Sequence, residues 1–355
     1  MRHQRFAAAA AVALLLIGTL RAGFYDPQRP TSPLITTTGV RPMAPDQFRD
    51  ELDKLTLTAD PNRPKGPRAA VTKHRDELLT RGLGNFSPTD LAALGAVQWR
   101  LRDGDTALAT LKQAAVRDPR NFWALTHLGS VHQALGQQRE ALPNLESSRD
   151  VFPDPWPGGS VAGAWFKQVE GYQFKLLRLR LREGMGRPTG GRPIPAADVD
   201  ALFDVKFVGP NGHYEAGKLA DADKAKLPPD AVAIVQQLLL WFPEDTRLLW
   251  LLGELYNAGG DLEAASRTLD QCVWSRRYES PALREHRRVV REAFDTQAKS
   301  ASAAGASPAP APEWLPMNWQ VCTVIGVFGL LFLALLYWQV WEWLRRLRGP
   351  RAFAE

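Results

Sequence analysis

The spacing of hydrophobic residues divides the chain into a helical middle and two apolar ends. Residues 87–153 predict four helices, in which apolar positions recur at the three- and four-residue steps of a helix face. Asn121 and Ser87 stand where helices would begin, and Pro88 suits a first helical turn because its missing N–H is not needed there. The middle of the chain therefore predicts an all-α fold.

The same region carries a period of 34 residues. The matched positions are Leu94-Gly95 with Leu128-Gly129, Ala107 with Ala141, Leu111 with Leu145, Ala114 with Ser148, and Pro119 with Pro153. A third copy starts at Gly163 and runs into one long helix, and a further unit returns with Leu252-Gly253 and Tyr256. This pattern resembles the tetratricopeptide repeat (TPR), a helix–turn–helix unit of the same length. The resemblance implies an α-solenoid in two blocks, 71–183 and 230–298, in which small residues let paired helices approach closely.

The segments around the two blocks are expected to be less regular. Residues 26–70 hold eight prolines and predict an extended linker, which includes one candidate short helix at 46–57. Residues 184–229 predict a loop and a β-hairpin insert, because valine and phenylalanine alternate before an Asn-Gly turn. Residues 299–317, rich in alanine, serine and proline, predict a spacer.

The first 25 residues have the features of an export signal. Arg2 and Arg5 precede an uncharged run of 15 residues, Phe6–Leu20. At about 1.5 Å per residue the run is about 22 Å long, which is short of the roughly 30 Å of a bilayer core. Residues 1–25 therefore predict a signal peptide, with an uncleaved anchor as the alternative.

The C-terminal region predicts a membrane-spanning helix, 318–342. No charged residue lies between Trp314 and Trp341, and tryptophans stand at both ends of the stretch, as they do at the two interfaces of a bilayer. Arginines follow at once in the tail, 343–355, and positive charge stays on the cytoplasmic side. We therefore expect a single-pass protein with a cytoplasmic C-terminus and with the bulk of the chain in the periplasm or otherwise outside the cytoplasm.

Composition and motifs argue against an enzyme, a metalloprotein or a nucleic-acid-binding protein. The formal net charge is +6 over 355 residues, which is too small an excess to indicate nucleic acid. The two cysteines, Cys272 and Cys322, give no disulfide framework, and no Cys/His cluster has zinc spacing. No G-x-S-x-G, H-E-x-x-H or C-x-x-C motif occurs. We expect no catalytic residue, no cofactor and no metal.

A repeat scaffold without catalytic motifs predicts protein–protein interaction in the cell envelope. The TPR resemblance implies that the first helix of each repeat lines a concave groove. This makes Gln98, Trp99, His127, Val131 and Tyr256 candidate partner-binding residues. A peptide segment of another protein would lie in that groove.

Arginines near the end of the second block give a further binding surface and a first alternative. Arg284 and Arg288 share one face of a predicted helix and are also candidate partner-binding residues. In the alternative, the protein has a structural role in the envelope, and its basic faces bind anionic lipid or polysaccharide.

A second alternative is a hydrolase with its site in the insert, at 198–227. Asp204, His213 and Glu215 would then carry the chemistry. Against it, the aspartates of this segment, Asp200 among them, are expected to lie in a solvated loop or to cap a helix.

Overall fold

The computed structural model describes residues 32–62, 65–80, 82–185 and 198–304. The predicted signal peptide, membrane-spanning helix and cytoplasmic tail lie outside these ranges, as does most of the predicted spacer. Within them, no helix combines the length and the apolar character needed to cross a bilayer. The described residues up to position 296 belong to one compact unit.

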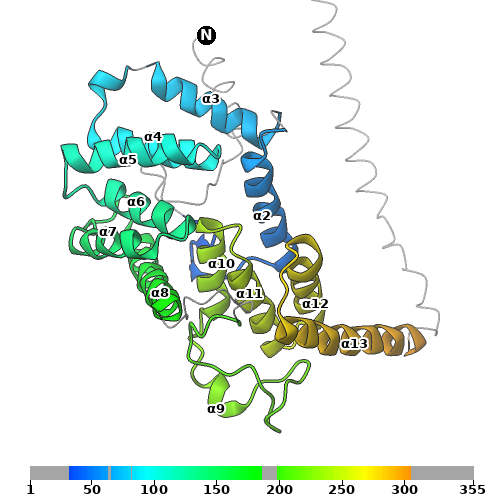
Figure 1. The fold of residues 1–355 in the computed structure, drawn as a ribbon. Helices are drawn as coiled ribbons and strands as arrows, with labels where there is room; N and C mark the ends of the chain where they lie inside the picture. Colours follow the sequence, from blue (N-terminus) through cyan, green and yellow to red (C-terminus); the bar gives the residue numbers. More distant parts are fainter. Residues whose placement is uncertain (1–31, 63–64, 81, 186–197, 305–355) are drawn as a thin grey trace, which may run out of the picture. The chain divides into compact units, whose positions relative to one another are not determined.

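Helices account for nearly all of the regular structure in these ranges (Figure 1). They are α2 (Pro45–Ala59), α3 (Pro67–Leu79), α4 (Pro88–Arg100), α5 (Gly104–Arg117), α6 (Phe122–Ala134), α7 (Gln138–Asp150), α8 (Ser160–Met185), α9 (Asp221–Lys224), α10 (Ala231–Trp241), α11 (Thr246–Ala258), α12 (Leu262–Asp270) and α13 (Pro281–Ala304). Other elements are a 3-10 turn (Leu83–Asn85), a π-helix (Gln271–Ser275) and the paired antiparallel strands β1 (Ile35–Thr36) and β2 (Gly39–Val40). The predicted all-α class is confirmed.

Three helical hairpins, α4–α5, α6–α7 and α11–α12, share the same turn. In each, a backbone N–H just before the second helix donates to a carbonyl near the end of the first. The donors and acceptors are Asp103 to Gln98 (3.0 Å), Gln137 to His132 (2.8 Å) and Asp261 to Tyr256 (3.0 Å). The sequence period therefore corresponds to a repeated helix–turn–helix geometry, and the four helices predicted over 87–153 are present.

A glycine in the first helix of each hairpin allows a leucine of the second helix to come close. A Cβ atom at Gly95, Gly129 or Gly253 would lie 2.6, 2.6 or 2.8 Å from the side chain of Leu111, Leu145 or Leu269, respectively. These separations are shorter than van der Waals contact, so any larger residue would force the helices or the leucine to shift. The close helix approach expected from the repeated Leu-Gly positions is confirmed.

The third copy departs from the hairpin geometry. Gly163 lies in α8, where a Cβ atom would meet the side chain of Trp156 at 2.7 Å instead of a leucine from a following helix. Trp156 belongs to an aromatic cluster, with ring centroids 5.7 Å from Phe122 and 5.0 Å from Phe152. The copy therefore continues as one long helix, as predicted, packed against these rings.

The two predicted blocks share one hydrophobic core. Phe166 of α8 and Trp241 of α10 stack with ring centroids 6.3 Å apart. A single cluster of buried residues includes side chains from α2, from the first block and from α10 to α13. The blocks are therefore packed together rather than separated into two lobes.

The predicted linker, residues 26–70, is folded where the structure describes it, which corrects the prediction. Phe48 and Leu52 of α2 each expose 2% of their surface and lie in the shared core. Pro45 and Pro67 occupy the first turns of α2 and α3. Proline favours that position because its fixed φ suits a helix and no N–H is needed there, so these prolines begin helices instead of preventing them.

Hydrogen bonds join the segment before α2 to α10. The side-chain amide of Gln236 accepts from the N–H of Met43 at 2.8 Å and donates to the carbonyl of Met43 at 3.0 Å. The hydroxyl of Ser32 donates to Oε1 of Gln237 at 2.5 Å. The segment from residue 32 to the end of α2 is thus an integral part of the helical unit.

The predicted β-hairpin in the insert is wrong, although its turn is present. The N–H of Gly209 donates to the carbonyl of His213 at 2.7 Å, but the described part of the insert contains no strand. Phe203 and Val205 are buried in the shared core, and Phe203 meets Tyr172 of α8 edge-on at 5.5 Å. The alternating apolar residues therefore pack onto a helix rather than across a pair of strands.

Candidate binding surfaces

A groove with a volume of about 700 Å³ runs between α2 and the α11–α12 hairpin, and we call it the α2–α12 groove. Figure 1 shows α2 beside this hairpin. The floor is apolar and is formed by Phe48 and Leu52 of α2 with Leu249, Leu252 and Tyr256 of α11. A concave surface of this kind is typical of sites that bind another molecule.

Charged side chains around the α2–α12 groove are mostly acidic. Arg267 joins α12 to α2 through Asp46, with nitrogen and oxygen 3.1 Å apart. The complete charged lining is Asp46, Asp53, Asp261, Glu263 and Asp270 against Arg49 and Arg267. Asp270 is also paired with Arg287 and Arg291 of α13, so the lining keeps a small excess of negative charge, which is complementary to a basic partner.

An exposed tryptophan also lines the α2–α12 groove. Trp274 lies in the π-helix Gln271–Ser275 and exposes 66% of its surface. Arg287 of α13 lies over its ring, with the guanidinium carbon 5.0 Å from the ring centroid. Short π-helical turns occur frequently at functional sites, and tryptophan is among the residues that contribute most to protein interfaces.

The structure places the five predicted groove residues in different surroundings. Gln98, His127 and Val131 are buried, and Nδ1 of His127 lies 3.2 Å from a backbone carbonyl of α4. Tyr256 belongs to the floor of the α2–α12 groove, and Trp99 lines a second cavity. The inner faces of α4 and α6 are covered by packing within the chain, so the three buried side chains would meet a partner only after rearrangement.

The two predicted arginines of α13 are exposed but already paired. Arg288 lies 2.6 Å from Glu285 and 2.9 Å from Glu292, and hydrogen bonds to these carboxylates raise its pKa. Arg284 lies 3.7 Å from Glu279. The basic face is therefore interleaved with acidic groups, which weakens the case for lipid binding there.

The second cavity, which we call the inner cavity, has a volume of about 480 Å³. It lies between α2 and α3 on one side and the ends of α4, α6 and α10 on the other. Its apolar lining includes Leu55, Val71, Trp99, Leu135 and Trp241, and arginine, acidic, threonine and glutamine side chains also line it.

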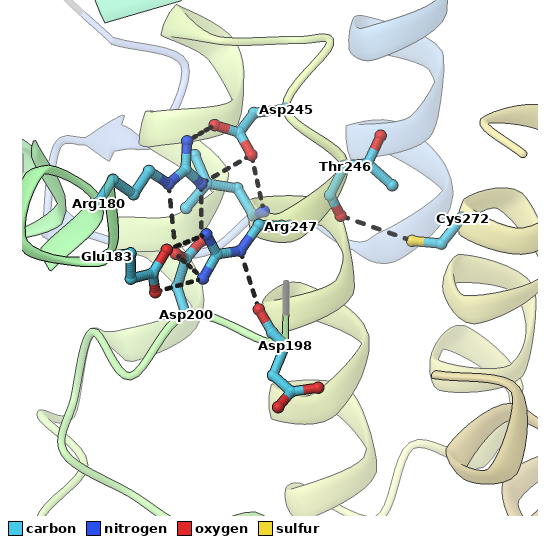
Figure 2. Close-up of polar contacts among 9 residues, drawn as sticks. Arg180, Glu183, Asp198, Asp200, Asp245, Thr246, Arg247 and Cys272 are labelled. Carbon is cyan, nitrogen blue, oxygen red and sulfur yellow. Dashed lines mark hydrogen bonds and ion pairs between the residues drawn. The ribbon is translucent and has the colours of Figure 1, made fainter. Parts of the chain in front are cut away.

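A buried ion-pair network borders the inner cavity (Figure 2). Arg180 of α8 donates to Asp200 at 2.7 Å and to Asp245 at 2.9 Å. Arg247 of α11 donates to both carboxylate oxygens of Glu183, at 2.8 and 2.9 Å, and lies 2.9 Å from Asp200. The network thus joins α8, the insert and the first turn of α11.

Burial and charge act in opposite directions on the pKa values of this network. Burial opposes the charge on Arg180, but attraction to Asp245 and Asp200 outweighs it, so the pKa of Arg180 is raised. Burial raises the pKa of Asp200, while Arg180 and Arg247 favour its ionised form. The prediction that Asp200 is solvated is wrong, because its side chain is fully buried between two guanidiniums.

Two of the three residues of the hydrolase alternative are held in separate ion pairs. Asp204 pairs with Lys175 at 2.7 Å, Glu215 pairs with Lys218 at 2.8 Å, and His213 is exposed. In the part of the chain that the structure describes, no three His, Cys, Asp or Glu side chains are grouped so that they could hold a metal ion.

The α2 side of the groove was not among the predicted site residues. Phe48, Leu52 and Trp274 come together only because α2 packs beside α11 and α12, which lie about 200 residues further along the chain. The amphipathic pattern over 46–57 predicts a short helix, but the pattern of one helix does not show which other helices its apolar face packs against.

Comparison with known proteins does not place the chain in a family. No protein-family model matches it, and no curated protein sequence matches it either. Its function is therefore inferred from its sequence and from the geometry and charge of the described residues.

Proposed function

We propose that the protein is a membrane-anchored, extracytoplasmic scaffold whose TPR-like hairpins bind another protein. The recurrent glycine–leucine contacts support TPR-like repeats. The segment 318–342, which carries no charge before Glu342 and is followed by arginines, supports a membrane anchor that leaves the repeats outside the cytoplasm. The partner is bound, and no reaction is carried out on it.

The α2–α12 groove is the observation that carries this proposal. It combines an apolar floor, an acidic rim and the exposed ring of Trp274. A basic amphipathic segment would set its apolar side on the exposed ring of Trp274 and its lysines or arginines against the rim. Loss of a central aromatic anchor from such an interface costs about 2 kcal/mol or more of binding free energy.

Site-specific photo-crosslinking in intact membranes tests the proposal. A photoreactive amino acid replaces Trp274, or Arg49 on the α2 side of the groove. A matched control replaces Val116 of α5, which exposes 81% of its surface away from the groove lining.

We expect one discrete protein adduct from both groove positions and none from position 116. High salt should reduce the adduct, because screening weakens the attraction between a basic segment and the acidic rim. Equal labelling from all three positions, or no adduct from either groove position, would contradict the proposal.

A further inference from the structure

The inner cavity has the size and lining of a small-molecule site. Its volume of about 480 Å³ falls within the roughly 300–1,000 Å³ typical of ligand pockets. Leu55, Val71, Trp99 and Trp241 give it apolar and aromatic walls. Such walls would bury the apolar body of a ligand.

Arg102, which lines the inner cavity, adopts a backbone conformation that the other hairpins give to glycine. Its φ is 68°, and the equivalent residues are Gly136 (φ 75°) and Gly260 (φ 82°). The N–H of each donates to the carbonyl three residues earlier, at 2.9 to 3.0 Å. A side chain disfavours this left-handed region, so the turn would be more stable with glycine. Strain of this kind beside a cavity points to a role for the side chain itself.

Positive charge exceeds negative charge in the lining. Arg100, Arg102 and Arg180 face Glu244 and Asp245 around the inner cavity. Arg102 pairs with Glu244, yet 40% of its side chain stays exposed. A guanidinium has five N–H donors and a single carboxylate accepts two at most in a bidentate pair, so Arg102 retains donors for a second anion.

A neighbouring arginine adds to the positive potential. Burial and the charge of Arg276 both lower the pKa of Arg102. Repulsion between the two guanidiniums would be relieved by an anion bound beside Arg102.

Gln133 supplies a buried donor that has no acceptor. It exposes 6% of its surface and lines the inner cavity, and its Nε2 has no hydrogen-bond partner among the described residues. Its Oε1 accepts from Gln173 at 3.0 Å, which fixes the orientation of the amide. A buried N–H without an acceptor is costly, and an oxygen of a ligand would satisfy it.

We propose that the inner cavity binds a small organic anion, with its carboxylate at Arg102 and Gln133 and its apolar body against Trp99 and Leu55. The site is distinct from the α2–α12 groove, because the two linings have no residue in common. Binding of a partner protein in the groove can therefore fail while this proposal stands.

Calorimetric titration of the full-length protein in lipid nanodiscs tests the site, with empty nanodiscs as the blank. The probes are 1-naphthoate and its neutral analogue 1-naphthalenemethanol. We expect naphthoate to bind at least about tenfold more tightly than the alcohol. Decanoate, titrated in the same way, distinguishes an acyl body from an aromatic one.

Two substitutions at the strained position separate ligand binding from folding. R102G should weaken naphthoate binding at least about tenfold without lowering the melting temperature, because glycine suits the turn. R102K keeps the charge but not the forked donors and should give an intermediate affinity. The matched control R139Q removes an exposed arginine of α7 and should leave the affinity unchanged. Equal binding of the acid and the alcohol, unchanged binding by R102G, or no binding of either acid at millimolar concentration would overturn the proposal.

Discussion

The contact between Gly129 and Leu145 gives the sharpest prediction for the helical hairpins. In Gly129→Ala the new Cβ would lie 2.6 Å from Cγ of Leu145. Forcing an extra carbon into a packed core costs about 1–3 kcal/mol. The higher helix propensity of alanine offsets up to about 1 kcal/mol of this cost. With the full offset, we expect a net loss of up to about 2 kcal/mol of unfolding free energy.

Gly171→Ala is a matched control for Gly129→Ala. Gly171 lies in α8 on an exposed face, and a Cβ there would meet no atom within 4 Å. Alanine should therefore stabilise this helix by about 0.5–1 kcal/mol. Urea denaturation of both variants, followed by circular dichroism, measures the difference. If Gly129→Ala proved as stable as Gly171→Ala, the close approach of α6 and α7 would be refuted.

A double-mutant cycle identifies the leucine as the cause of the loss. Leu145→Ala alone should cost about 2–5 kcal/mol, because it removes a buried side chain. In the double variant the clash is gone, so its total loss should be smaller than the sum of the two single losses by about 1 kcal/mol or more. Strict additivity would show that Gly129→Ala acts through another contact.

Three further substitutions test the buried contacts of the helical unit. Burial raises the pKa of the Cys272 thiol to about 12, so in a Cys322→Ser background a maleimide should fail to label the native chain at about pH 8 and should label it after unfolding in urea. The unfolded thiol titrates near pH 9, so the stability that the buried, protonated thiol gives the fold is complete below pH 9 and is lost as the pH rises towards 12. Cys272→Ala should therefore reduce the loss of stability at alkaline pH, measured as the melting temperature against pH. Phe48→Ala should destabilise the chain by about 3–5 kcal/mol in urea denaturation and speed proteolysis before α3, and an unchanged midpoint would mean that α2 does not belong to the core. Arg180→Met should cost about 3–5 kcal/mol because Asp200 and Asp245 lose their shared partner, whereas Arg139→Ala should stay within about 0.5 kcal/mol of the parent.

The repeated hairpins could be predicted from the sequence because their contacts are local. Gly95 and Leu111, or Gly129 and Leu145, lie on consecutive helices, so one period fixes both the residue types and the partners. The 34-residue period also predicted the long helix α8. Gly163 lies 34 residues after Gly129, but the residues that follow it do not match the rest of the repeat.

The remaining contacts depend on long-range packing that no local pattern specifies. From the sequence alone, the prolines of residues 26–70 predict a linker. The structure shows instead that Phe48 and Leu52 of this segment lie in the core. In the sequence, Arg180 lies in a basic stretch with Arg178 and Arg182, and Asp200 lies in a segment rich in aspartate. Each pattern alone predicts a solvated surface. The hydrogen bond of 2.7 Å from the Arg180 guanidinium to the Asp200 carboxylate forms only because the insert packs against α8.

The central claim, that the hairpins are displayed outside the cytoplasm, is tested by labelling cysteines in intact spheroplasts. A membrane-impermeant maleimide is applied to Val116→Cys in the exposed part of α5 and to Ala352→Cys in the tail, and buried Cys272 should stay unlabelled in both. We predict labelling at position 116 in intact spheroplasts and labelling at position 352 only after lysis. Labelling of the tail in intact spheroplasts, with position 116 protected until lysis, would contradict the account.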